Sequence, residues 1–168
     1  MRVLVTAASK HGATAEIAEA IGRALAGLSL DVSVVRAEDV TTVAGFDAVV
    51  LGSGVYAGHW LEPARRIVDH HAGDLRERPV WLFSSGPIGD PPKPEPEVSV
   101  DVADIEAAVE PREHRVFTGK IDKSVLGFAE KAILLAVRAG EGDHRDWQAI
   151  DAWAGRIAAE LTAASGNP

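Results

Sequence analysis

Residues 3–14, with the sequence VLVTAASKHGAT, decide the fold class. The stretch opens with a short apolar run and passes through small and hydroxyl-bearing residues. It then leads into a helical pattern in which Ile17, Ile21, Leu25 and Leu28 recur on one face. A buried strand that leads directly into an amphipathic helix is typical of the first unit of a parallel α/β sheet.

The same alternation of strand and helix continues along the chain. Four more strands are predicted at residues 32–35, 48–51, 80–83 and 115–118. Further helices are predicted at residues 62–72 and 101–110 and after residue 146, with Asp146 as a candidate first-turn acid or cap of the last one. We therefore expect a five-stranded parallel sheet in the order 2-1-3-4-5, with helices on both faces.

Composition limits the chemistry and the partners of this chain. It has 168 residues and no cysteine, which predicts one domain over residues 1–168 and excludes thiol and iron–sulfur chemistry. The formal charge of −8 disfavours nonspecific binding to nucleic acid. The longest uninterrupted apolar run, residues 132–137, is too short to span a membrane, and no signal peptide precedes the first strand. These features predict a cytoplasmic protein.

Three loops of unusual composition follow the first, third and fourth predicted strands. Residues 6–14 carry hydroxyls and a glycine before a helix, which suits an anion, although Ser9 or His11 could instead simply cap that helix. Residues 52–60 place glycines around Tyr56, so that a flat ring could stack there, although Tyr56 and Trp60 could instead pack on the sheet edge.

The third loop, residues 84–90, is polar and rich in glycine. A doubly wound sheet brings the ends of these strands together at one edge, where such folds bind their ligands. A phosphate site beside a platform for a flat ring suggests FMN as the ligand.

These residues resemble those of the flavodoxin-domain proteins, and within them the branch that includes menaquinone-dependent protoporphyrinogen oxidase. The stretches that carry the resemblance are ASKHGAT (8–14), GSGVYAG (52–58), FSSGP (83–87) and GDHRDW (142–147). The resemblance implies a flavodoxin-like three-layer sandwich that binds FMN. It implies that the phosphate is bound by Ser9, Lys10, His11, Gly12, Ala13 and Thr14. It also implies that the isoalloxazine ring is bordered by Val55, Tyr56, Ala57, Gly58, Ser84, Ser85 and Gly86.

The sequence departs from many flavodoxins at two places. The phosphate loop is not the compact Ser/Thr-x-Thr-Gly-x-Thr, and the third loop has no aromatic residue to clamp the ring. We therefore expect a flavin with one less-covered face, which suits the stacking of a substrate or a quinone.

Residues 120–142 form a connection longer than a five-stranded domain requires. Apolar residues between Val125 and Val137 predict an extra helix that is apolar around most of its circumference. Protoporphyrinogen oxidases that this chain resembles carry an extra segment near here, implicated in handling hydrophobic partners. Two alternatives remain open: a core helix or homodimer interface, and a surface for a quinone, a tetrapyrrole or peripheral membrane contact.

The leading functional hypothesis is an FMN-dependent oxidoreductase. It would pass electrons from a reduced substrate, with a protoporphyrinogen-like compound as the candidate, to a quinone or a protein acceptor. The alternative is a flavodoxin-type electron-transfer protein without a substrate of its own. A phosphoacceptor receiver domain is set aside, because Thr6-Ala7-Ala8 and Gly52-Ser53 stand where it needs acidic residues. The histidine spacing predicts no metal site, and no catalytic side chain is assigned.

Overall fold

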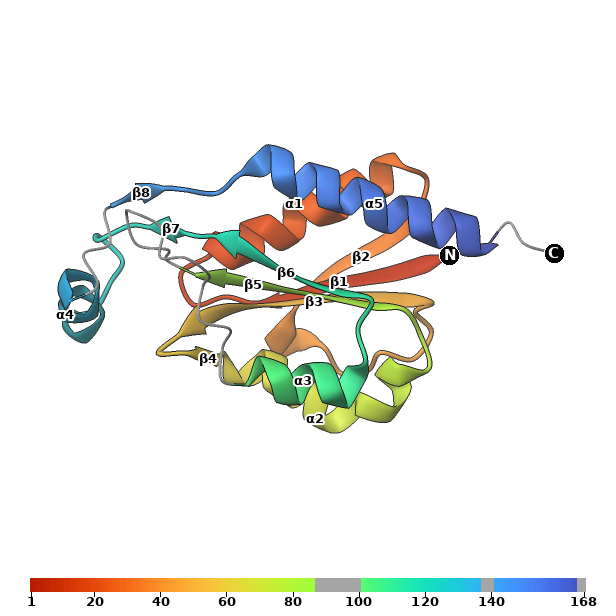
Figure 1. Ribbon diagram of the computed structural model, residues 1–168, viewed down its shortest axis with the longest axis horizontal. Helices are drawn as coiled ribbons and strands as arrows, with labels where there is room; N and C mark the ends of the chain where they lie inside the picture. The colour runs from red at the N-terminus through yellow and green to blue at the C-terminus, as the bar shows by residue number, and fades with distance from the viewer. Residues whose placement is uncertain (87–100, 137–140, 166–168) are drawn as a thin grey trace.

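The computed structural model describes residues 1–86, 101–136 and 141–165. Its central sheet holds five parallel strands in the order β2-β1-β3-β5-β6 (Figure 1). The five strands are β1 (Arg2–Ala8), β2 (Asp31–Arg36), β3 (Ala48–Tyr56), β5 (Val80–Gly86) and β6 (Glu113–Thr118). Counted over these strands, the order is 2-1-3-4-5, so the predicted fold is confirmed.

Among the described residues, two helices cover each face of the sheet (Figure 1). The pair α1 (Ala13–Gly27) and α5 (Trp147–Ser165) packs on one face, and α2 (Glu62–Arg76) and α3 (Val102–Val109) pack on the other. The strands serve both layers because successive side chains point to opposite faces. In β1, Val3 and Val5 enter the core under α1 and α5, whereas Leu4 enters the core over α2 and α3. A short 3-10 turn, η1 (Ala37–Asp39), follows β2.

The ends of two helices follow from local sequence. The backbone amide of Ala149 donates to the Asp146 carboxylate at 2.9 Å, which confirms Asp146 as the cap of α5. Helix α3 ends where Glu110 adopts a left-handed conformation with φ of 50°, one residue before Pro111.

The predicted loop at residues 52–60 is a strand end followed by a hairpin. Strand β3 continues to Tyr56 because its ladders with β1 and β5 extend past Gly52. It then turns back into the short strand β4 (His59–Trp60), which pairs with it antiparallel. The turn residues Ala57 and Gly58 have φ of 51° and 79°, the left-handed pair that tight two-residue hairpins use.

The segment at residues 120–142 leaves the sheet as an arm. It contains β7 (Lys120–Ile121), α4 (Phe128–Ala136) and β8 (Gly142–Asp143), and β7 pairs antiparallel with β8. The arm lies beyond the carboxyl ends of the sheet strands (Figure 1). We expected one extra helix here, but α4 is shorter and lies between the two strands of a ribbon. The exposed fractions of Phe128 and Leu135 are 93% and 78%, so these side chains are not part of the core.

Two sequence expectations fall wholly or partly outside the described residues. They are the part of the third loop after Gly86 and the end of the extra helix at Val137. None of the described helices has the length and apolar character needed to cross a membrane.

A buried arginine holds the arm against α1. The side chain of Arg145 is 3% exposed, and it donates two hydrogen bonds of 2.8 and 2.6 Å to the Asp143 carboxylate. It also donates to Glu16 at 2.6 Å and to the carbonyl oxygen of Ala13 at 3.1 Å. Its guanidinium lies 4.4 Å from the ring centre of Trp147. One side chain therefore connects the end of the ribbon to the first turn of α1.

Replacing Gly52 by alanine tests the close packing of β3. A Cβ atom there would lie 2.1 Å from the ring of Phe83, and that ring is fully buried against Phe117 and Trp153. We expect Gly52→Ala to lower the free energy of unfolding by about 1–3 kcal/mol in urea titrations. Gly155→Ala is the control, because apart from its two chain neighbours and the backbone of its own helix no described atom lies within 4 Å of its Cβ position. It should leave the stability equal or higher, and a Gly52→Ala variant as stable as wild type would contradict the packing argument.

Replacing Arg145 by methionine tests the link between the arm and α1. The hydrogen bonds from Arg145 lower the pKa of Asp143 to about 2, against the opposing effect of burial. A depressed carboxyl pKa stabilises the fold above the ordinary pKa near 4, and this contribution is lost as the pH falls toward 2. We expect Arg145→Met to lower the free energy of unfolding at pH 7 by about 2 kcal/mol. This loss is small for a buried arginine because its partners Glu16 and Asp143 are both partly exposed, so that water screens the ion pairs.

The difference between wild type and Arg145→Met should narrow as the pH falls from 5 toward 2, measured by urea unfolding at each pH. The matched control is Arg156→Met, because Arg156 is half exposed and pairs with Glu113 at 3.4 Å. That variant should change the stability by less than about 0.5 kcal/mol. An equal loss of stability in Arg145→Met and Arg156→Met would show that Arg145 behaves as an ordinary surface arginine.

Candidate functional site

A pocket opens at the carboxyl edge of the sheet, where four segments of the chain meet. The start of α1, the β3–β4 hairpin, the end of β5 and the beginning of the arm form its walls. The described residues that line it are Ser9, His11, Ala13, Thr14, Gly54, Val55, Tyr56, Ala57, Ser85, Gly86, Gly119, Lys120, Ile121, Asp122, Val125 and Leu126.

The three predicted loops do meet at this pocket. Of the residues predicted from the sequence, the structure brings together Ser9, His11, Ala13, Thr14, Val55, Tyr56, Ala57, Ser85 and Gly86. Lys10, Gly12, Gly58 and Ser84 are not among the described residues that line it. Lys10 lies nearby, because its Nζ atom stands 5.3 Å from the ring centre of Tyr56, and Gly12 and Gly58 shape the backbone beside the pocket.

The first wall is the start of α1. Gly12 has φ of 87°, a left-handed conformation that lets the chain turn directly into the helix. The Glu16 amide donates to the Gly12 carbonyl at 2.9 Å, while the amides before it have no acceptor within the helix, as at any helix start. Gly12 occupies the N-cap position and has no side chain to cap the helix, so neither Ser9 nor His11 stands at that position. Thr14, which is buried, completes a wall of amides and hydroxyls suited to an anion.

The second wall is the hairpin with Tyr56. The Tyr56 ring meets the His11 ring edge-on at 6.2 Å between centres, and the same tyrosine is close to Gly54. A Cβ atom on Gly54 would lie 3.2 Å from both the Tyr56 ring and the Thr14 hydroxyl. The glycine therefore lets the hairpin and the start of α1 approach closely, which places an aromatic ring beside the anion-binding wall.

The third and fourth walls are joined by a close backbone contact. The Gly119 amide donates to the Gly86 carbonyl at 2.9 Å, and a Cβ atom on Gly119 would lie 3.0 Å from that oxygen. This contact directs the chain after β6 into the pocket. Ile121 is nearly buried there and packs against Leu126. These arm residues were not predicted to belong to the site, because only the folded backbone brings residues 119–126 to the strand ends.

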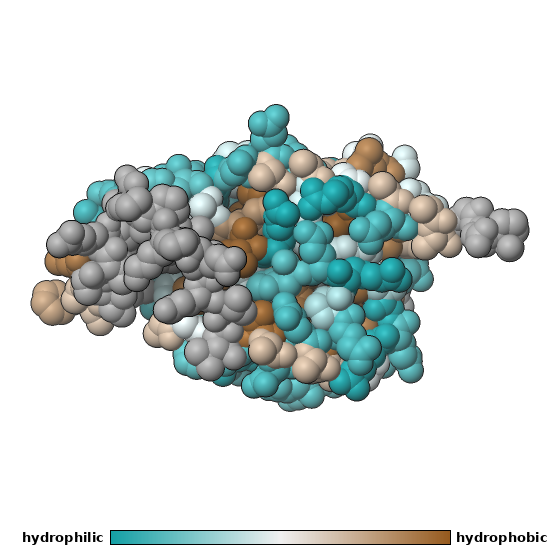
Figure 2. Space-filling model, in the orientation of Figure 1, coloured by the Kyte–Doolittle hydropathy of each residue, from teal (hydrophilic) through white to brown (hydrophobic). Residues whose placement is uncertain are grey.

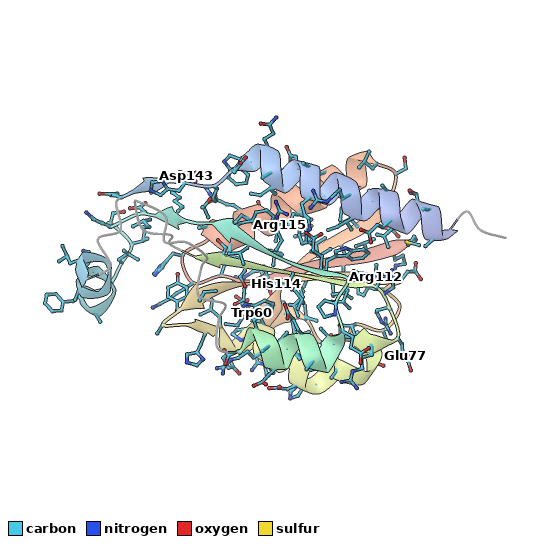
Figure 3. All side chains as sticks on the ribbon, in the orientation of Figure 1. Trp60, Glu77, Arg112, His114, Arg115 and Asp143 are labelled. Carbon is cyan, nitrogen blue, oxygen red and sulfur yellow. The ribbon has the colours of Figure 1, made fainter. Side chains whose placement is uncertain are left out.

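Ser84 belongs to a buried network beneath the hairpin. The Trp60 indole N–H donates to the Ser84 hydroxyl at 2.8 Å, so that hydroxyl can donate to Nε2 of His114, also at 2.8 Å. Nδ1 of His114 then faces Glu106 at 3.3 Å. Burial lowers the pKa of His114 and so favours the neutral ring, whereas Glu106 acts in the opposite direction. Figure 3 shows Trp60 and His114 close together between the sheet and α3.

This network resembles a serine–histidine–acid set, but its serine is buried and is not a described pocket residue. Its role is to hold Trp60, whose backbone amide also donates to Asp101 at 3.1 Å. Because Trp60 pairs with Val55 in the β3–β4 hairpin, the network fixes one wall of the pocket from behind. Among the described residues, no three acidic or histidine side chains cluster closely enough to hold a metal ion.

The electrostatics of the first wall depend on Arg145, which lies in the GDHRDW stretch and was assigned no role from the sequence. Glu16 lies in the first turn of α1, where its charge would oppose a bound anion. The 2.6 Å ion pair with Arg145 offsets that charge. No sequence signal separated Arg145 from the other arginines, because its partner Glu16 is far away in the chain.

Comparison with known proteins places this fold. The family model described as flavodoxin domain matches residues 4–148. No curated protein sequence matches the chain. A flavodoxin from the domain Archaea superposes with a TM-score of 0.67 at 19% identity, over 96% of this chain and 99% of that one.

Two further structures are similar. Rubredoxin oxygen:oxidoreductase from Desulfovibrio gigas gives a TM-score of 0.65 at 14% identity, over 99% of this chain and 37% of that one. Two-electron reduced Megasphaera elsdenii flavodoxin gives 0.58 at 20% identity, over 74% of this chain and 90% of that one. At these identities the likeness shows the fold, and the family model shows the kinship. The chain belongs to the flavodoxin domain family.

Proposed function

We propose that this protein binds FMN in the pocket at the carboxyl edge of the sheet and transfers electrons through it. The observation that carries the proposal is the meeting of an anion-binding helix start and an aromatic ring in one pocket. Membership of the flavodoxin domain family supports it. The chain has no cysteine, so a redox function needs a bound cofactor.

The phosphate of FMN fits the first wall. Free amides at the start of α1 and the hydroxyls of Ser9 and Thr14 are donors of the kind that a phosphate accepts. The positive end of the helix adds a favourable field, and the ion pair of Glu16 with Arg145 removes an opposing charge. We assign the phosphate to residues 9–14, with Lys10 at the rim.

The flavin ring fits the remaining walls. Tyr56 offers an aromatic face, and Val55, Ala57, Ser85 and Gly86 offer small or apolar borders. Gly58 permits the tight turn, and Ser84 supports Trp60 behind the hairpin. Bound FMN would supply reversible one- and two-electron chemistry, while these residues bind and orient the ring and limit its contact with water.

The finer proposal is an oxidoreductase that takes electrons from a reduced substrate, with a protoporphyrinogen-like compound as the candidate, and passes them to a quinone. Exposed apolar side chains on α4 favour a hydrophobic partner or peripheral contact with a membrane. Figure 2 shows hydrophobic residues, coloured brown and tan, at the end of the molecule where α4 lies.

The second candidate is an electron-transfer protein that serves a protein partner and has no substrate of its own. Its likeness in fold to flavodoxins that match along almost their whole length favours it. The net charge of −8 would help such a protein to dock on basic redox partners.

Replacing Thr14 by valine tests the phosphate site. Valine keeps the shape of threonine and removes the hydroxyl, so the protein should lose one hydrogen bond to a charged group. We expect wild type to bind added FMN, and Thr14→Val to bind it about 10- to 100-fold more weakly, measured by quenching of flavin fluorescence.

The matched control for Thr14→Val is Thr162→Val on α5, where the hydroxyl donates to the carbonyl of Ala158 within its own helix. Its affinity for FMN should equal that of wild type. Wild-type protein that binds no FMN at micromolar concentrations would refute the proposed function. An unchanged affinity in Thr14→Val would refute the role of that hydroxyl.

Turnover separates the two candidates. The enzyme hypothesis expects the FMN-loaded protein to oxidise protoporphyrinogen in the presence of a menaquinone analogue, followed by porphyrin fluorescence. The assay excludes oxygen, and the control omits the quinone, so that the bound FMN then has no acceptor for the electrons of the substrate and cannot turn over. No turnover, together with rapid reduction by a flavodoxin reductase, would favour the electron carrier.

A further inference from the structure

The arm supplies an aliphatic wall to the pocket. Ile121, Val125 and Leu126 all line the pocket and all come from the segment that begins at β7. We name these three residues the aliphatic wall. The third loop holds no aromatic residue to cover a ring. The described pocket residues beside Gly86 are Val55 of the second loop and Gly119 at the start of the arm.

We propose that the aliphatic wall packs against the isoalloxazine ring and is a binding surface for the flavin. The inference rests on the proposed function and adds to it a fourth segment, with Ile121, Val125 and Leu126 as ring-contacting residues. A flavin ring is flat and largely apolar at its dimethylbenzene end, and aliphatic side chains bury such a surface without competing for its hydrogen bonds.

The partial exposure of the aliphatic wall is consistent with a binding surface for an apolar ligand. Ile121 is 5% exposed and packs with Leu126, so it forms the base of the wall. Val125 is 50% exposed although it lines the pocket. A ligand that covered Val125 and the partly buried Leu126 would remove apolar surface from water, which is the general source of affinity in such sites.

The wall is held in place independently of any ligand. The Gly119 amide donates to Gly86, and the His144 amide donates back to the Gly119 carbonyl at 3.2 Å. A turn that begins at Asp122 fixes the backbone at Val125. The Asp122 carboxylate accepts a hydrogen bond from the Ser124 amide at 2.9 Å, and the Asp122 carbonyl accepts one from the Val125 amide at 3.3 Å. A wall fixed in this way loses little freedom when a ring binds.

Ring contact and phosphate contact can be separated with riboflavin, which has the same ring and no phosphate. If the aliphatic wall touches the ring, its loss must weaken the binding of FMN and riboflavin by the same factor. Loss of a phosphate contact, as in Thr14→Val, must weaken FMN alone. The ratio of the two dissociation constants therefore shows which part of the ligand a residue contacts.

The experiment uses the full chain with the substitutions Val125→Asn and Leu126→Ala, singly and together. We expect the double variant to bind FMN and riboflavin each about tenfold more weakly than wild type, by titration of flavin fluorescence. Iodide should also quench the bound flavin more strongly, because the ring is less covered. Phe128→Ala is the matched control on the same arm, since Phe128 is almost fully exposed and is not among the described pocket residues. Its dissociation constants should equal those of wild type.

A second substitution keeps the test valid if the double variant folds poorly. Leu126→Trp would place an indole beside the ring, which should lower the emission of each bound flavin. Two outcomes would overturn the inference and leave the proposed function intact, provided that wild type binds FMN. One is unchanged dissociation constants in the double variant, and the other is unchanged flavin emission in Leu126→Trp. A variant that weakened FMN but not riboflavin would also overturn it. Wild type that bound neither flavin would remove the proposed function and this inference together.

Discussion

The parallel pairing of β1, β3 and β5 is the constraint on which the rest of the structure depends. Parallel strands end at the same edge of a sheet, and the register here sets Ala8 beside Ser53 and Gly54 beside Ser85. The chain therefore leaves three strands within one small region. The start of α1, the β3–β4 hairpin and the contact between Gly86 and Gly119 all follow from that arrangement, so the pocket is a consequence of the ladder.

Charge at this edge is balanced by a residue that belongs to a different part of the chain. The first turn of α1 attracts anions through its free amides, but Glu16 in that turn works against them. Arg145 pairs with Glu16 and with Asp143, and it reaches the first turn from the end of the ribbon. The contacts by which Arg145 offsets the charges of Glu16 and Asp143 also hold the arm against α1. The electrostatics of the pocket wall formed by α1 and the position of the wall formed by the arm are therefore coupled.

The sequence predicted what local patterns and general topology determine. Apolar runs identified the five long strands, and the number of strands at this chain length suggested their order. Asp146 was recognisable as a candidate cap because capping acts within one turn. The hairpin after β3 was not predicted, because its turn is formed by Ala57 in a left-handed conformation that alanine seldom adopts. The ribbon and the role of Arg145 were missed for another reason: their partners lie far away along the chain, and no local pattern encodes such pairings.

The arm joins the two parts of the proposed function. Its beginning supplies Ile121 and Leu126 to the pocket, and its middle carries Phe128 and Leu135 exposed on α4. If a ring binds against the aliphatic wall, a partner that covers α4 contacts the same short segment that touches the ring. Both candidate functions require a short distance between the ring and the partner, since electrons must pass between them. They differ in the partner, because a small apolar acceptor would reach the ring through the pocket, whereas a protein acceptor would bury the exposed side chains of α4.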